Sequence, residues 1–229
     1  MFSIVIPIYN ESESLKDLVD EISESLKNYN QYEIIFVNDA SKDNTIQIIK
    51  DLQKKTKIKL LNNTSNKGQS YSITKGIKES LNEIIITMDG DGQNNPKDIP
   101  ILLDYYISNE KIYLVGGIRS KRIDSFIKII SSKFANKIRS FIFKDDCDDT
   151  GCSLKVFSKS IFLKFPYFNG IHRFLPSLFK GYGSECFYIK VDHRSRKKGI
   201  SKYGTIDRLF KGIIDIIRVR KIIKDFKNN

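Results

Sequence analysis

Residues 84–93 read IIITMDGDGQ, an apolar run that ends in alternating aspartates and glycines. Asp89 and Asp91 are one residue apart, and Gln93 follows at the same spacing. The apolar run predicts a buried strand, and the acidic residues come where that strand ends. Carboxylates gathered at such a place are costly alone, whereas a divalent cation between them offsets the cost. The stretch therefore predicts a strand that leads into a metal or ligand site.

Two other interpretations fit an Asp-Gly-Asp-Gly run. A tight turn that needs glycine at positive φ has the same letters. A calcium loop counted from Asp89 requires glycine where the chain has Asn94 and glutamate where it has Pro100, so the calcium interpretation fails. The metal site and the plain turn both stay open on this stretch alone.

Strand-like and helix-like segments alternate through the first half of the chain. Apolar runs predict strands at 2–8, 32–39, 58–61, 83–89 and 111–117, and helical spacing predicts helices between them, at about 15–26, 44–55, 70–80 and 96–107. Such alternation predicts an α/β fold with a Rossmann-like, mostly parallel sheet flanked by helices.

Polar clusters follow three of the predicted strands. They read YNE at 9–11, NDAS at 38–41 and DGDGQ at 89–93. In open α/β sheets, ligands bind beyond the carboxyl ends of the strands. We therefore expect the three clusters to meet at one edge of the sheet.

The second half of the chain is less regular. A helix is predicted at 124–143, and the last segment has the spacing of an amphipathic helix. Its apolar face is predicted to hold Ile206, Leu209, Phe210, Ile213, Ile214, Ile216 and Ile217, and its polar face Asp207, Arg208, Lys211, Asp215 and Arg218. Without repeats or a low-complexity linker, we predict one domain at 1–204 and a C-terminal extension at 205–229. The extension suits either a membrane interface or packing on the core.

The charge of the chain narrows its partners. The 39 Lys and Arg residues against 27 Asp and Glu residues give a formal net charge of +12. Compositional bias, nucleic acid, an anionic membrane and phosphate-bearing small molecules are the explanations of such a charge. Because no helix-turn-helix, zinc-finger or aromatic RNA-binding signature is present, nucleic acid is disfavoured.

Compartment signals point to the cytoplasm. No segment approaches the roughly 20 apolar residues of a membrane-spanning helix, and the first residues lack the pattern of a signal peptide. The cysteines Cys147, Cys152 and Cys186 match no zinc spacing and are odd in number, which favours reduced thiols. We expect a cytoplasmic protein.

Six blocks in order connect the chain with a known family. They read VIPIYNE, FVNDASKDNT, MDGDGQNNP, DTGCSLKVF, FNGIHRFLPSLF and HRSRKKGISKYG. With them the chain resembles, over residues 2–204, the family 2 glycosyltransferases of the dolichol-phosphate mannosyltransferase type. The resemblance implies a GT-A fold and a nucleotide-sugar donor of the GDP-mannose or UDP-glucose class. It also implies inverting transfer of one sugar to a polyprenyl or dolichyl phosphate at the cytosolic membrane face. A lipid acceptor, the lack of a membrane-spanning segment and the net positive charge together predict a peripheral protein drawn to anionic lipid.

The resemblance assigns the donor side of the site. Asp91 and Gln93 are the expected metal ligands, with Asp89 supporting metal or nucleotide, and Mg²⁺ or Mn²⁺ is the expected cofactor. The expected nucleotide-binding residues are Pro7, Tyr9, Glu11, Asp39, Lys67 and Asp89. For Asp39 a capping turn with Ser41 is the alternative, and Tyr9 equally suits the core. Lys67 and Gly68 enter a helix, where backbone N–H groups favour phosphate.

On the acceptor side, a phosphate is already ionised near neutral pH and needs cations more than a base, whereas a hydroxyl acceptor needs a general base. Arg119, Arg196 and Lys202 are the candidate cations. Asp149 matches an aspartate near the reacting centre of relatives, where it orients the acceptor or acts as the base. His172 and Arg173 suit either the sugar or acceptor region or a helix start.

Two alternatives to the polyprenyl-phosphate transferase remain. One is an enzyme of the same fold that acts on a sugar hydroxyl of a polysaccharide or lipid-linked glycan. The other is a non-catalytic binder of nucleotide sugars. The metal motif and the basic segment at 193–204 favour an enzyme over a binder.

Overall fold

The computed structural model describes residues 1–120, 136–195 and 205–228, and over 205–211 the backbone alone. Seven strands form one sheet in the order β3-β2-β1-β4-β6-β5-β7. The strands are β1 (Phe2–Ile8), β2 (Tyr32–Asn38), β3 (Ile58–Asn62), β4 (Ile84–Thr87), β5 (Ile112–Arg119), β6 (Lys155–Ser158) and β7 (Glu185–Val191). The first five confirm the strands predicted from the sequence.

The helices are α1 (Leu15–Ser25), α2 (Thr45–Leu52), α3 (Gln69–Lys78), α4 (Ile99–Ile107), α6 (Lys159–Phe162), α7 (Leu175–Gly181) and α8 (Thr205–Asn228). Two 3₁₀ turns, η1 (Pro96–Asp98) and η2 (Ile171–Arg173), precede α4 and α7. Residues 136–143 are also helical, which agrees with the described part of the helix predicted at 124–143.

The sheet is mostly parallel, as the alternation of strands and helices predicts. β1 pairs in parallel with β2 and with β4, and β2 pairs in parallel with β3. Parallel pairing brings the carboxyl ends of these four strands to the same edge of the sheet. The three polar clusters follow β1, β2 and β4 at that edge.

Two strands were not predicted. β6 pairs antiparallel with β4 and β5, and β7 pairs in parallel with β5 at the end of the sheet. The four residues of β6 are too few to show a period. β7 lies at an edge, and its sequence ECFYIKV mixes charged and apolar residues in a partly exposed strand. The sequence pattern that would reveal a strand is therefore weak in both β6 and β7.

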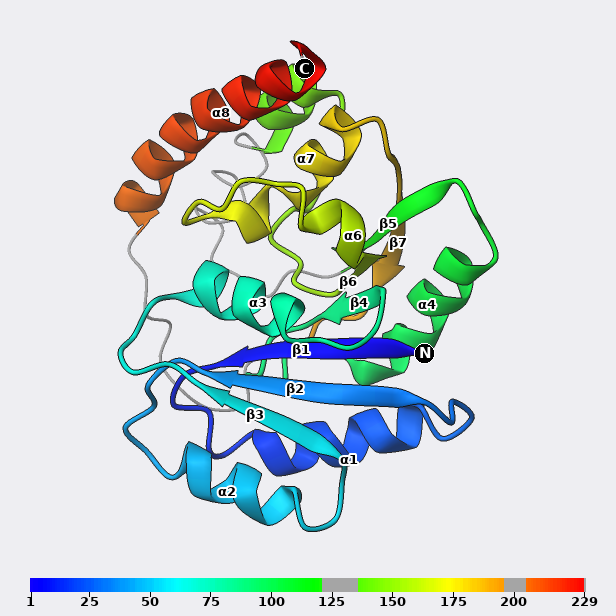
Figure 1. The fold of residues 1–229 in the computed structure, drawn as a ribbon, viewed down its shortest axis with the longest axis vertical. Helices are drawn as coiled ribbons and strands as arrows, with labels where there is room; N and C mark the ends of the chain where they lie inside the picture. The colour runs from blue at the N-terminus through cyan, green and yellow to red at the C-terminus, as the bar shows by residue number, and fades with distance from the viewer. Residues whose placement is uncertain (121–135, 196–204, 229) are drawn as a thin grey trace.

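Helices cover both faces of the sheet (Figure 1). On one face α1, α2 and α4 share a core cluster with β1 and β2 that includes Leu15, Ile22, Ile49 and Leu102. On the other face α3 and α7 form a second cluster, which includes Ile73, Ile77, Leu178 and Phe179. Val219 of α8 belongs to this second cluster, so α8 packs on the domain.

The predicted division of the C-terminal helix into an apolar and a polar face is wrong at Asp215. Asp215, which the helical spacing assigned to the polar face, is buried, with 4% of its surface exposed. Ile213, Ile214 and Ile217, which it assigned to one apolar face, are all more than half exposed. The expectation failed because Asp215 finds cationic partners inside the protein, which a periodic pattern does not reveal. Among the described residues, no helix is long and apolar enough to cross a membrane.

Candidate functional site

The three polar clusters lie together at the carboxyl edge of the sheet. The backbone N–H of Asn10 donates to Ser41 Oγ at 2.9 Å, and Lys42 N–H donates to Asn10 Oδ1 at 2.7 Å. Ser14 Oγ donates to the carbonyl of Gly90 at 2.7 Å. These bonds join the loops after β1 and β2 with each other and with the DGDGQ loop after β4.

The DGDGQ loop approaches β1 closely. A Cβ at Gly90 would lie 2.5 Å from Ile8 Cγ2, so a larger residue there would force the loop away from the strand. Gly92 has φ +75°, which a residue with a side chain rarely adopts. The two glycines thus let the loop fold against the sheet while Asp89 and Asp91 stay partly exposed.

Asp89 is held from two sides. Its Oδ1 accepts from Gln69 Nε2 at 2.8 Å, and its backbone N–H donates to Asn94 Oδ1 at 3.0 Å. Burial and, next, the charge of Asp91 raise the pKa of Asp89 to about 6, although Lys155 acts in the opposite direction. The carboxylates repel one another, so a cation placed between them would be stabilised.

The start of the basic segment lies against Gln93. Arg194 N–H donates to the Gln93 carbonyl at 2.9 Å, and Gln93 Nε2 donates to the Arg194 carbonyl at 3.3 Å. Beside them Asn94 and His193 form an antiparallel bridge. Arg194 is fixed further by an ion pair with Glu21 at 2.6 Å. The described start of the segment, at 193–195, therefore borders the acidic loop.

Arg119 and Asp149 form a nearly buried ion pair beside this edge. Arg119 Nε donates to Asp149 Oδ2 at 2.6 Å, and Nη2 donates to Oδ1 at 2.7 Å. Their side chains are 12% and 6% exposed. A Cβ at Gly151 would lie 2.9 Å from Arg119 Nη2, so the glycine admits the guanidinium to the turn that carries Asp149.

Lys155 stabilises the turn that carries Asp149 through hydrogen bonds to its backbone. It is 3% exposed, and its Nζ donates to the carbonyls of Thr150 and Cys152. The Cys152 N–H in turn donates to the carbonyl of Asp149 at 3.2 Å. Sequence reasoning did not single out Lys155, because a lysine in an apolar strand is normally read as a residue at the surface.

Asp39 is fully engaged within the protein. Its Oδ1 accepts from Asn63 Nδ2 and from Lys67 N–H, and its Oδ2 accepts from Gly68 N–H, all at 2.8 Å. The two amides expected to favour phosphate therefore donate to Asp39 in this structure. Ser41 N–H donates instead to Asn38 Oδ1, so Asp39 forms no capping turn with Ser41.

The remaining predicted residues divide into two sets. Pro7, Tyr9 and Glu11 are half-buried at the end of β1 and the start of its loop, and the side chain of Lys67 is exposed. The Glu11 N–H donates to Thr45 Oγ1 at 3.1 Å. Arg196 and Lys202 lie outside the described residues.

The structure adds residues that sequence reasoning missed. Gln69, the first residue of α3, reaches Asp89. The next residue, Ser70, contacts His172 Nδ1 at 2.7 Å and accepts from Gly170 N–H at 2.8 Å. His172 therefore lies at this edge beside α3, a placement that no spacing rule reveals because the two segments are 102 positions apart.

The side chains near the DGDGQ loop resemble a magnesium or manganese site more than a closed protein cage. In the described part of the chain, no three His, Cys, Asp or Glu side chains are grouped to hold a metal. Asp89, Asp91 and Gln93 offer two carboxylates and an amide oxygen. Mg²⁺ takes few protein ligands and completes its shell with water and substrate phosphates, so this donor set fits it.

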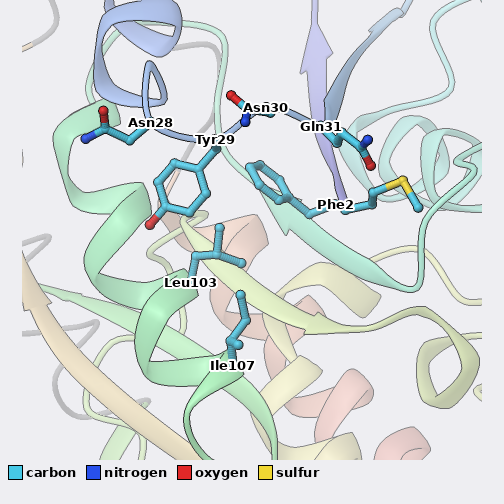
Figure 2. Close-up of a pocket in the computed structure, with 8 residues that line it drawn as sticks. Phe2, Asn28, Tyr29, Asn30, Gln31, Leu103 and Ile107 are labelled. Carbon is cyan, nitrogen blue, oxygen red and sulfur yellow. The ribbon is translucent and has the colours of Figure 1, made fainter.

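A pocket of about 280 Å³ lies at the opposite edge of the sheet, where β1 begins. Figure 2 shows Phe2 and Tyr29 beside Leu103 and Ile107 of α4. Tyr29 donates to Asp104 at 2.5 Å, and burial followed by this bond raises the pKa of Tyr29 to about 12. None of the predicted site residues lines this pocket, so it is separate from the candidate site.

Solved structures show the same fold at low identity. Mannosyl-3-phosphoglycerate synthase from Rubrobacter xylanophilus superposes with a TM-score of 0.74 at 11% identity, covering 96% of this chain and 73% of that one. Glucosyl-3-phosphoglycerate synthase from Mycobacterium tuberculosis, in complex with Mg²⁺ and uridine diphosphate, superposes with a TM-score of 0.71 at 12% identity, covering 94% and 79%. The predicted GT-A architecture is thereby confirmed.

Sequence relatives are more similar. The chain is 33% identical over 222 residues to dodecaprenyl-phosphate galacturonate synthase of Rhizobium johnstonii, and 33% identical over 220 residues to undecaprenyl-phosphate 4-deoxy-4-formamido-L-arabinose transferase of Yersinia pestis. These alignments cover 95% and 94% of this chain but only 65% and 66% of the relatives. The sequence model described as "Glycosyl transferase family 2" matches residues 3–167. The chain belongs to glycosyl transferase family 2.

Proposed function

We propose that this glycosyltransferase moves one sugar from a nucleotide sugar to a polyprenyl phosphate, in a metal-dependent reaction with inversion. The observation that carries the proposal is the acidic DGDGQ loop at the carboxyl edge of the sheet, with the Arg119–Asp149 pair beside that edge. Both relatives named above act, by their names, on a polyprenyl phosphate.

The metal role falls to Asp89, Asp91 and Gln93. Because the Gln93 amide nitrogen donates to the Arg194 carbonyl, the amide oxygen is the atom that remains for a cation. A bound Mg²⁺ or Mn²⁺ supplies Lewis-acid stabilisation of the diphosphate leaving group. The protein's part is to hold the two carboxylates apart on a loop that Gln69 and Asn94 fix from either side.

The nucleotide role falls to Pro7 at the end of β1 and to residues in the loops after β1, after β2 and before α3, namely Tyr9, Glu11, Asp39 and Lys67. In this proposal Asp39 shapes the wall of the nucleotide site by holding the Lys67–Gly68 turn, because both of its oxygens already accept N–H donors. The exposed Lys67 side chain supplies charge toward the diphosphate.

The acceptor class follows from the Arg119–Asp149 pair. A hydroxyl acceptor needs a base, but both oxygens of Asp149 accept hydrogen bonds from the guanidinium. A phosphate acceptor is already anionic, so a positioned cation serves it better than a base. The pair therefore supports a phosphate acceptor over the alternative of a sugar hydroxyl. Arg196 and Lys202 complete the cationic set in the proposal.

The range of donor sugars in this proposal is wider than the GDP-mannose and UDP-glucose class that the resemblance implies. The names of the relatives include a galacturonate and a formamido-arabinose. A test of the donor must therefore include acidic and amino sugars as well as mannose and glucose. The enzyme is proposed to act as a peripheral protein at the cytosolic membrane face, where its lipid acceptor lies.

Thermal unfolding against a panel of GDP- and UDP-sugars, with and without Mn²⁺, tests the donor site. A ligand that binds the folded protein raises its midpoint by mass action. We expect one nucleotide family to raise the midpoint in a metal-dependent manner, and Asp91→Ala to abolish that rise. Exposed Asp20→Asn in α1 is the matched control.

Transfer is then tested by incubating the protein with a polyprenyl phosphate and the donor so identified, whose sugar carries a radioactive label. The expected product extracts into organic solvent and releases its sugar in mild acid. An acid-resistant glycoside would favour the sugar-hydroxyl alternative. Binding of the donor without transfer to any acceptor would instead support the alternative of a non-catalytic binder of nucleotide sugars.

A further inference from the structure

Helix α8 buries one face on the domain. Val219 is fully buried, and Ile216, Ile222 and Ile223 pack against the same core cluster. A Cβ at Gly181 of α7 would lie 2.4 Å from Ile223 Cδ1, so this contact is close. These residues form the inner face of α8. The remaining isoleucines of the described part of the helix are not needed to pack it on the domain.

Asp215 fixes the rotation of the helix about its axis. Its side chain is 5% exposed, Oδ2 accepts from Arg173 Nη2 at 2.9 Å, and Oδ1 accepts from Arg218 Nη1 at 3.0 Å. A rotation that buried the opposite face would separate the carboxylate from Arg173, which is costly for a buried charge. The apolar residues on the opposite side are thus held outward.

That opposite side, which we call the outer face of α8, carries three isoleucines in the part of the helix whose side chains are described. Ile213, Ile214 and Ile217 are 53%, 57% and 66% exposed. At 100° per residue, exposed Lys221 and Lys224 continue the stripe formed by Ile217. Between residues 218 and 228 the sequence has five basic residues and one acidic residue. An apolar patch is thus followed directly by a basic one.

We propose that the outer face of α8 docks on an anionic lipid bilayer. The proposal rests on the proposed function, because the acceptor there is a lipid phosphate. Isoleucines that enter the headgroup region beside lysines that meet anionic headgroups form the pattern of an interfacial helix. A second copy of this chain is a poorer occupant, since symmetric pairing of this face would bring like charges together.

The same helix is tied to the candidate site. Arg173, which binds Asp215, is the neighbour of His172, and His172 contacts Ser70. Ser70 follows Gln69, whose side chain donates to Asp89. Docking of the outer face therefore places the edge of the sheet that carries the acidic loop near the bilayer surface, where a lipid phosphate lies.

Vesicle co-sedimentation tests the docking. The probes are vesicles of phosphatidylcholine alone and vesicles with about one third phosphatidylglycerol. We expect the protein to bind the anionic vesicles and to be released by high salt. Ile213→Ser/Ile217→Ser should lower the partition coefficient about tenfold or more, and Lys221→Gln/Lys224→Gln should abolish the preference for anionic lipid.

Leu81→Ser is the matched control, because Leu81 is 82% exposed and lies between α3 and β4. It should bind vesicles as the wild type does. Equal binding by wild type and Ile213→Ser/Ile217→Ser, with unchanged unfolding midpoints, would overturn the proposal. Loss of a dimer in that variant during sedimentation, without vesicle binding by the wild type, would overturn it in favour of a second copy.

A short-chain, water-soluble prenyl phosphate separates this proposal from the proposed function. If the Ile213→Ser/Ile217→Ser variant transfers sugar to that acceptor normally but fails with a long-chain acceptor in vesicles, docking is supported. If the wild type transfers sugar to the soluble acceptor but never binds vesicles, the docking proposal is wrong and the proposed function is supported. Vesicle binding without transfer to either acceptor would remove the function and keep the docking.

Discussion

The guanidinium of Arg119 and the carboxylate of Asp149 form two parallel hydrogen bonds, of 2.6 and 2.7 Å, across 30 positions of sequence. The backbone N–H of Arg119 also donates to Asp149 Oδ2 at 3.3 Å. The pair joins the end of β5 to the turn before β6. It therefore serves the fold as well as the proposed acceptor site.

Removal of one partner of this pair should cost more than removal of both. Asp149→Ala leaves a nearly buried guanidinium without its carboxylate, and we expect the free energy of unfolding to fall by about 3 kcal/mol. The double variant Arg119→Met/Asp149→Leu should lose less. Urea unfolding of Arg119→Met, Asp149→Leu and the double variant gives the coupling. The exposed Asp148→Ala is the control, and additive losses would show that the pair is not coupled.

The raised pKa of Asp89 predicts a pH-dependent stability. Between pH 4 and pH 6 the folded protein holds a proton on Asp89 that the unfolded chain has lost, because the pKa rises from 3.8 to about 6 on folding. Stability from this group is therefore full below about pH 4 and is lost as the pH rises through 6. An asparagine at position 89 carries no charge at any pH, so Asp89→Asn should remove this pH dependence.

In metal-free buffer, Asp89→Asn should unfold several degrees above the wild type at pH 8, and the difference should vanish near pH 4. Thermal denaturation followed by circular dichroism measures it. Added Mn²⁺ should reverse the order at pH 8, since the cation stabilises only the carboxylate. A variant that melts below the wild type at pH 8 without metal would contradict the raised pKa.

Much of the fold could be predicted from the sequence because long apolar runs and helical spacing report burial directly. β1, β2 and β4 follow from their runs of buried residues, and the edge where their loops meet follows from parallel pairing. β6 could not be predicted, because its place between β4 and β5 is set by antiparallel pairing with both. Tertiary contacts, not local pattern, decide it.

The candidate site shows the same division. Residue type and spacing indicate the acidic loop at Asp89–x–Asp91–x–Gln93, and the resemblance indicates Arg119 and Asp149. Neither reveals that the last two bind each other. The burial of Asp215 is likewise invisible in the sequence, since a helix of alternating charge and isoleucine fits two rotations about its axis. Its ion pair with Arg173 and the packing of Val219 on the domain distinguish them.

Asp39→Asn should weaken both the fold and the donor site. Because both oxygens of Asp39 accept from N–H groups, an amide nitrogen in place of either would face another donor. We expect a loss of about 1–3 kcal/mol in the free energy of unfolding. Binding of the nucleotide, followed by calorimetry, should weaken about tenfold as the turn before α3 loosens. Asp51→Asn on the exposed side of α2 should change neither, and an unchanged nucleotide affinity in Asp39→Asn would remove this residue from the donor site.

Two glycines that contact or belong to α8 should respond oppositely to alanine. Gly170 has φ +116°, and a Cβ there would lie 2.6 Å from Asp215 Oδ2 and 2.9 Å from Arg173 Nη2. Gly170→Ala should therefore strain the backbone, displace the ion pair that holds α8 and lower the unfolding midpoint. Gly212 lies within α8, and none of the atoms that the structure describes lies within 4 Å of a Cβ placed there.

Gly212→Ala should raise the stability of the helix by up to about 1 kcal/mol, because alanine is the better helix former. Urea unfolding of both variants at one pH measures the two effects, and amide hydrogen exchange localises them. Gly170→Ala should speed exchange within α8 more than within β1 and β2 if the Arg173–Asp215 pair is what holds the helix. Equal exchange in α8 of the wild type and Gly170→Ala would show that the inner isoleucines hold the helix without the ion pair.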